Sequence, residues 1–125
     1  DIGNWIFKDE NDSHIFTISE NTILQVGDYL VLCGDTSSFT SLFPNVENFI
    51  GNLGFGFSGN GELLRLFNPE NELVDFVEYD DSNPWPTQPD GNGPTLELIN
   101  PYSDNNTPEN WSGSTGYGSP GQSNN

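Results

Sequence analysis

The chain has 125 residues, of which 19 are acidic and 2 are basic, giving a formal net charge of −17. Lys8 and Arg65 alone cannot form the cationic cluster that binds phosphates, so the composition excludes nucleic acid as an ordinary partner and gives no anchor for an anionic membrane surface. No apolar run approaches the roughly 20 residues needed to cross a bilayer, and we expect no membrane insertion. Because 13% of the residues are aromatic, we expect one folded domain rather than a disordered chain.

Short apolar segments alternate with Gly, Pro, Asn, Asp and Ser, and helical periodicity is nearly absent, which is typical of an all-β domain. In chain order, we expect strands at Trp5–Lys8, His14–Ile18, Asp28–Cys33, Glu62–Asn68, Glu72–Tyr79 and Thr95–Ile99, with shorter extended pieces near Val46–Ile50 and around Trp111. A short helical turn is expected between Asp35 as its N-cap and Pro44 at its end. The single cysteine, Cys33, excludes an internal disulfide, and we expect it to be a buried residue at a strand end.

A hairpin is predicted around the turn Asn68-Pro69-Glu70-Asn71, where proline suits the second turn position. Its two strands carry apolar side chains on both faces, so we expect both to lie in the middle of a covered sheet. Residues 80–94 include four prolines, and we expect an irregular loop that is anchored by Trp85. We assign residues 1–111 to the domain and the Gly-, Ser- and Asn-rich residues 112–125 to a tail or linker.

Acidic and amide side chains crowd three loops, at residues 9–12, 80–83 and 103–106. Oxygen ligands of this kind suit a hard cation such as Ca²⁺, and the candidate ligands are Asp80, Asp81 and Asp104. None of the loops follows the twelve-residue calcium-binding pattern. The alternative is that Asp and Asn occur here because turns prefer them.

The three tryptophans, Trp5, Trp85 and Trp111, are candidates for an exposed surface that binds a sugar or a partner chain, and the alternative is that they pack in the core. Asp75 and Glu78 are expected on opposite faces of one strand, so they cannot form the carboxylate pair of a glycosidase. Asp75 is expected to accept hydrogen bonds instead. The sequence also has no nucleophile elbow, phosphate-binding loop or histidine cluster, and we expect no enzymatic activity.

Several motifs occur in an ordered series along nearly the whole chain. They are Asp1-Ile2-Gly3-Asn4-Trp5 at the start, Gly27-Asp28 further on, Gly61-Glu62-Leu63-Leu64, Asp90-Gly91-Asn92-Gly93-Pro94, and Asn110-Trp111 near the end. This series resembles the tail domain of lamins, and its later motifs are more similar to the bacterial, secreted branch than to nuclear lamins. The residues that match the family's structural motif are Asp1, Gly3, Trp5, Gly27, Asp90, Gly91, Gly93 and Trp111.

The resemblance implies an immunoglobulin-like β-sandwich without catalytic residues or a cofactor. It also implies an extracellular or cell-surface accessory module of a larger exported protein, which contacts a protein or a cell-surface polymer. The family's first one or two strands precede the position of Asp1 and are absent here, so we expect an uncovered sheet edge and an edge-paired or strand-exchanged oligomer unless a longer native chain supplies them. The alternatives are a carbohydrate-binding module and a calcium-dependent adhesion module.

Overall fold

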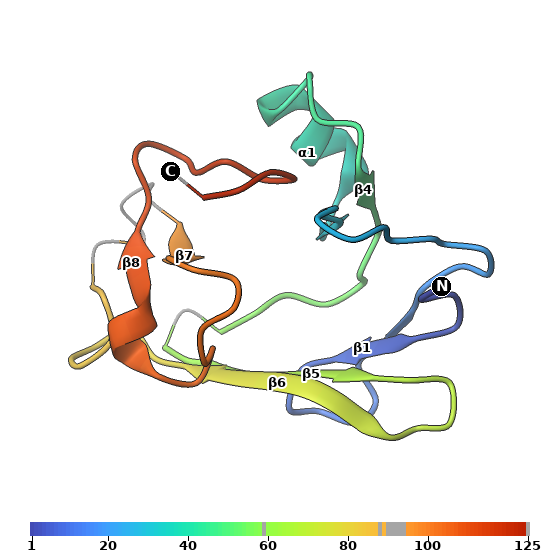
Figure 1. Cartoon of the computed structure of the whole chain (residues 1–125), viewed down its shortest axis with the longest axis horizontal. Coiled ribbons are helices and arrows are strands. Elements are labelled where there is room, and N and C mark those ends of the chain that lie inside the picture. The colour runs from blue at the N-terminus through green and yellow to red at the C-terminus, as the bar shows by residue number, and fades with distance from the viewer. Residues whose placement is uncertain (59, 88, 90–94, 125) are drawn as a thin grey trace.

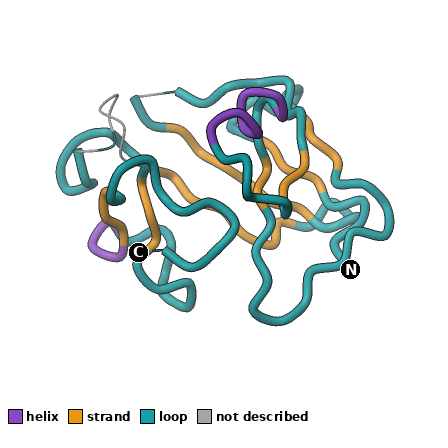
Figure 2. The backbone as a smooth tube through the Cα atoms, turned by 90° about the horizontal axis from the view of Figure 1, so that it is seen from above, coloured by secondary structure: helices purple, strands orange, loops and turns teal. Residues whose placement is uncertain are grey.

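The computed structural model describes residues 1–58, 60–87, 89 and 95–124. Within these residues the chain is mostly β, with one short α-helix, and most of the backbone lies in loops (Figure 2). The expected all-β class is confirmed in this coarse form. The elements are β1 (Ile6–Lys8), β2 (Ile15–Thr17), β3 (Val31–Leu32), α1 (Thr36–Leu42), β4 (Phe49–Ile50), β5 (Glu62–Phe67), β6 (Leu73–Tyr79), β7 (Leu96–Leu98), the 3₁₀ helix η1 (Pro108–Asn110) and β8 (Trp111–Gly113).

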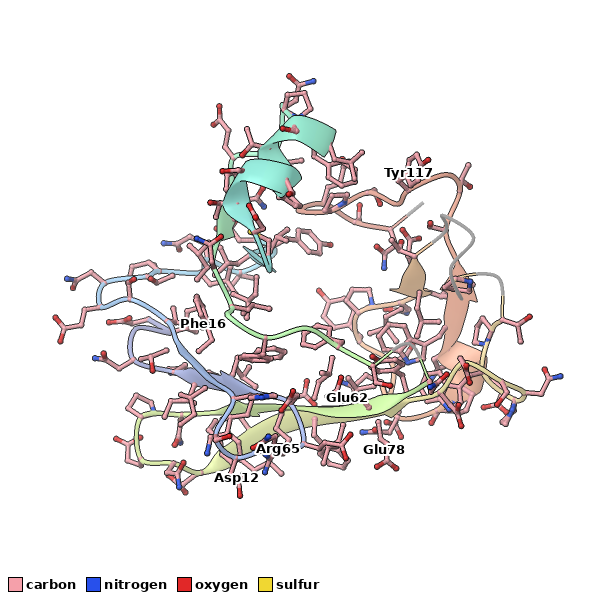
Figure 3. The ribbon with its side chains drawn as sticks, turned by 180° about the vertical axis from the view of Figure 1, so that it is seen from behind. Asp12, Phe16, Glu62, Arg65, Glu78 and Tyr117 are labelled. Carbon is pink, nitrogen blue, oxygen red and sulfur yellow. The ribbon has the colours of Figure 1, made fainter. Side chains whose placement is uncertain are left out.

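The described strands form one antiparallel sheet in the order β2-β1-β5-β6, a parallel pair β3–β4 and an antiparallel pair β7–β8. Both pairs and α1 lie on the same side of the four-stranded sheet (Figure 1). We call this side the inner face. The side chains of Phe16 and Glu62 point to the inner face, whereas those of Arg65 and Glu78 point to the opposite, outer face (Figure 3).

The predicted hairpin is confirmed, because β5 and β6 pair antiparallel across the expected turn. The backbone N–H of Asn71 donates to the Asn68 carbonyl at 2.9 Å and closes the turn, and Asn71 has a positive φ of 64°. Leu66 faces Asp75 whereas Phe67 faces Leu73, so β6 has one extra residue at this point. A type I turn followed by a left-handed residue and a bulge is a common hairpin connection.

The expected position of both hairpin strands inside a sheet is right for β5 and wrong for β6. β5 lies between β1 and β6, but β6 is an edge strand of the described sheet. The side chain of Asn106 replaces a neighbouring strand there: its amide nitrogen donates to the Phe76 carbonyl at 2.9 Å, and its oxygen accepts from the Glu78 N–H at 3.0 Å. An amide side chain thus satisfies the outward backbone groups of an apolar strand.

The helical turn begins as predicted, because the Asp35 side chain accepts hydrogen bonds from the Ser37 and Ser38 N–H groups at 2.8 and 3.1 Å. Phe39 of α1 lies over Phe49 of β4, with their ring centroids 5.0 Å apart. Cys33 is buried directly after β3, as expected. Helix, β3 and β4 therefore pack as one small unit.

The core is divided into small clusters. The buried hydrophobic residues in the described part of the chain are Ile18, Cys33, Leu53 and Trp85. A separate cluster on the inner face stacks Phe7 on Phe55 and sets Phe57 edge-on to Phe7. Many large apolar side chains remain exposed, among them Ile15, Leu73, Val74, Phe76 and Tyr117. No helix in the described part of the chain is both long and apolar enough to cross a membrane.

The segment after Trp111 lies against the rest of the chain. Ser119 is buried, the Asn48 side chain donates to the Gly121 carbonyl at 2.9 Å, and the Asn124 side chain donates to the Leu98 carbonyl at 2.6 Å. The domain boundary at residue 111 stays a prediction.

Candidate binding cleft

Two of the three predicted tryptophans meet in the structure. The rings of Trp85 and Trp111 lie 6.1 Å apart at an angle of 49°. Trp85 is only 8% exposed, so it anchors its loop, as expected, and is not the exposed aromatic ring that the sequence also allowed. Trp111 is half-buried, and its indole N–H donates to the Asn105 carbonyl at 2.9 Å. The pair holds the loop after β6 against β8.

A cleft of about 520 Å³ opens between the inner face of the sheet and the β7–β8 pair. This volume lies in the usual range for ligand sites. The walls are mainly apolar, with Leu64 and Val77 from the sheet, Leu96 and Trp111 from β7–β8, and Phe57 from the loop before β5. Asp80 and Asp81 also line it. We call this space the apolar cleft.

The sheet end of the apolar cleft is fixed by Tyr79, whose hydroxyl donates to the Ser58 carbonyl at 2.6 Å. Burial, and to a lesser extent the nearby Glu62 carboxylate, raises the pKa of Tyr79, so its phenol stays protonated. Gly61 allows this packing, because a Cβ at that position would lie 2.7 Å from the Tyr79 carbonyl oxygen and its φ is +111°. Only glycine combines that conformation with that close approach.

Asp80 and Asp81 give the apolar cleft its charge. The backbone N–H of Asp81 donates to Asp80 Oδ1 at 2.7 Å, and this hydrogen bond is the main reason why the pKa of Asp80 is lowered. Asp80 is therefore a carboxylate at neutral pH. A cationic group on a ligand would be attracted to this end of the cleft, whereas a second anion would be repelled.

Asp104, the third predicted metal ligand, is not among the residues that line the apolar cleft. Its Oδ1 accepts from the Asn106 N–H at 2.9 Å, and its carbonyl accepts from the Asn110 side chain at 2.9 Å. Among the residues that the structure describes, no three His, Cys, Asp or Glu side chains gather as a metal site. These acidic residues serve as turn formers in the structure, and specific Ca²⁺ binding stays a prediction.

The N-terminal motif forms a turn that leads into β1, far from the other two tryptophans in the sequence. Asp1 Oδ1 accepts from the Gly3 N–H at 2.7 Å, and the half-buried Trp5 accepts from the Ile18 N–H at 2.8 Å through its carbonyl. Gly27 lies in a turn with a positive φ of 84°. The remaining motif residues, Asp90, Gly91 and Gly93, lie outside the described residues.

One polar cluster was not predicted. Asp9 is 1% exposed, and its Oδ2 lies 2.7 Å from His14 Nδ1. Arg65 donates to the Asp9 carbonyl at 3.1 and 2.7 Å and to Asp12 Oδ1 at 2.8 Å. Burial alone raises the pKa of Asp9, but the hydrogen bonds from His14 and Asn11 outweigh it and leave that pKa lowered. The cluster locks the loop between β1 and β2 onto β5.

The sequence indicates the Asp9–His14 contact but not the contact with Arg65. Asp9 and His14 flank a short turn-rich segment, which brings them together once β1 and β2 pair. Arg65 arrives because β5 pairs with β1 so that Arg65 faces Lys8, and no sequence spacing indicates that register.

Comparison of the chain with known proteins finds no matching family model, no matching curated protein and no matching solved structure.

Proposed function

We propose that this chain is a non-catalytic interaction module that binds an extended segment of a partner protein in the apolar cleft. The observation that carries this proposal is the cleft itself, which has apolar walls from the sheet and from β7–β8 and two aspartates beside them. Such a site suits a ligand that combines apolar side chains with basic ones. The net charge of −17 favours basic partners in general.

The proposal extends to the fold family and the location. An immunoglobulin-like sandwich of the lamin tail type is supported by the ordered sequence motifs and by the position of β3–β4 and β7–β8 over one face of the larger sheet. The same resemblance supports an accessory role in an exported, extracellular or cell-surface bacterial protein.

The non-catalytic character is supported by the acidic residues of the hairpin. Asp75 pairs with Leu66 and Glu78 with Leu63, so the two carboxylates lie on opposite faces of the sheet. Asp75 accepts hydrogen bonds from the Phe76 N–H and from the Asn105 amide at 2.9 to 3.2 Å. These partners give Asp75 a structural role.

The test is a binding assay with two synthetic extended peptides, one that alternates Lys with Leu and one that alternates Glu with Leu. Isothermal titration at 150 mM salt limits general charge attraction, because the Debye length is then about 8 Å. We expect saturable binding of the Lys-Leu peptide and none of the Glu-Leu peptide. Polysaccharides and Ca²⁺ titrated in the same way would identify the alternative functions.

Two variants localise the binding. Phe57→Ser removes a wall of the apolar cleft without changing the charge, and it should weaken binding at least tenfold. Ile15→Ser is the matched control, since Ile15 is exposed to a similar extent, 52% against 45%, but lies in register with Lys8 and Arg65 on the outer face. Equal binding by both variants would show that the peptide is held by charge alone and would refute the proposal.

A further inference from the structure

One acidic side chain of β7, that of Glu97, is buried. The residue lies in the middle of β7 and is 5% exposed. Its Oε2 is buried and has no hydrogen-bond partner among residues 1–58, 60–87, 89 and 95–124. Because an unpaired buried charge is strongly unfavourable, a positive group placed beside this carboxylate would be strongly attracted to it.

The chain's own basic side chains are engaged elsewhere. Arg65 donates to the Asp9 carbonyl and to Asp12, and Lys8 Nζ lies 5.0 Å from the centre of the Phe67 ring. The single histidine pairs with Asp9. The sequence has only these two basic residues and one histidine, and none of the three is paired with Glu97 in the described structure, so a positive side chain for Glu97 would come from another molecule.

The surroundings of Glu97 indicate which kind of cation fits. Glu97 lines a cleft of about 500 Å³, which we call the Glu97 cleft, together with the rings of Phe39, Phe43, Trp111 and Tyr117. A hard metal ion such as Ca²⁺ requires six to eight oxygen ligands. In the described part of the chain, no three His, Cys, Asp or Glu side chains come close enough together to hold such an ion. Aromatic rings instead attract organic ammonium groups through the electron density of their faces.

We propose that the Glu97 cleft binds an alkylammonium group, with the Glu97 carboxylate as the counter-ion and the aromatic rings around its alkyl part. A lysine side chain of a partner and a small quaternary amine share this chemistry. Trp111 lines both clefts, but Glu97 and Tyr117 line only this one, so binding that requires these two side chains does not depend on the function proposed above.

The test is a titration of the intact chain with n-butylammonium chloride and with tetramethylammonium chloride, against sodium chloride at the same ionic strength. The readout is the NMR carboxyl carbon shift of Glu97 together with the ring signals of Tyr117, because both residues line the Glu97 cleft and not the apolar cleft. We expect saturable changes with an amine and none with sodium. Stronger binding of n-butylammonium would indicate a lysine side chain as the natural ligand, and stronger binding of tetramethylammonium a quaternary amine.

Three variants test the assignment. Glu97→Gln keeps the shape of the side chain and should reduce amine affinity at least tenfold, and Tyr117→Leu should reduce it by a smaller factor. Glu109→Gln, which neutralises an exposed acid on η1, should leave the affinity unchanged. If Glu97→Gln failed to fold, the wild-type carboxyl shift would still decide the question. The proposal would be overturned if the Glu97 signal did not move or if Glu97→Gln bound the amine as tightly as the wild type. It would also be overturned if the chain responded to Ca²⁺ and to neither amine.

The experiments distinguish a failure of the peptide-binding proposal from a failure of the amine-binding proposal. Loss of Lys-Leu peptide binding in Phe57→Ser with normal amine binding would support both. Amine binding without any peptide binding would leave only the Glu97 cleft, and peptide binding without amine binding would leave only the apolar cleft.

Discussion

Replacing His14 by alanine tests the buried pair that holds the loop between β1 and β2. The 2.7 Å contact to Asp9 is a hydrogen bond to a charged group, for which a contribution of about 1.5–3 kcal/mol is usual. Because the His14 side chain is 42% exposed, water replaces part of that interaction, and we expect a loss of about 2 kcal/mol at neutral pH. For a chain of this length, that loss lowers Tm by about 6–10 °C. Thermal unfolding followed by circular dichroism measures it.

The pH dependence of the same variant has a defined sign. The pKa of Asp9 is lowered in the folded state, so the stabilisation from its carboxylate is present above its ordinary value of about 4 and is lost as the pH falls through the folded-state pKa. The difference in Tm between the wild type and His14→Ala should therefore shrink in acid. Asp12→Asn is the control, because the Asp12 side chain is 80% exposed and its ion pair with Arg65 therefore contributes little. Equal shifts for both variants, or a difference that is independent of pH, would refute this reasoning.

Three further variants test other parts of the fold. Asn106→Ala should lower the unfolding free energy by about 1–2 kcal/mol and, by opening the β6 edge, raise the sedimentation coefficient at high concentration; a monomer of unchanged stability would contradict this. Asp35→Ala should cost about 1 kcal/mol through loss of the N-cap, measured by urea unfolding, and no change in the midpoint would contradict it. Gly61→Ala should destabilise the chain far more than Gly54→Ala, because both have positive φ but only Gly61 faces the Tyr79 carbonyl; equal shifts in Tm would contradict this.

Local chemistry in the sequence predicts the local elements well. The Asp35 cap and the Asn68-Pro69-Glu70-Asn71 turn depend on side chains within a few residues of each other, and both occur in the structure. The position of Trp85 between two prolines likewise predicts that it anchors its loop, and Trp85 is buried in the structure.

Long-range pairing is what the sequence does not show. The exposed edge of β6 is covered by Asn106, about 30 residues away in the sequence, whose side chain hydrogen-bonds to the β6 backbone. The burial of Asp9 and Glu97 depends on how separate segments pack, whereas acidic residues are mostly exposed on average. Composition therefore predicts a solvated acidic surface at the two positions where the structure buries a carboxylate.

The candidate clefts also depend on how segments distant in the sequence pack together. Trp111 and Asp80 are candidates from residue type alone. Asp80 comes directly after β6 and therefore lies near Val77, whereas the position of Trp111 beside Leu64 and Val77 follows from the placement of β8 over the inner face. The sequence thus suggests some of the residues that line a site, and the fold decides which of them share one.

A titration followed by ¹H–¹⁵N NMR tests the central proposal most directly, using the chain at 150 mM salt and the Lys-Leu peptide. The account predicts that the backbone signals of Leu64, Val77 and Leu96 and the indole signal of Trp111 move together and saturate, while the indole signal of Trp5 and the signal of Ile15 stay in place. Signals that move only on the outer face, or an unchanged spectrum at a saturating peptide concentration, would contradict it.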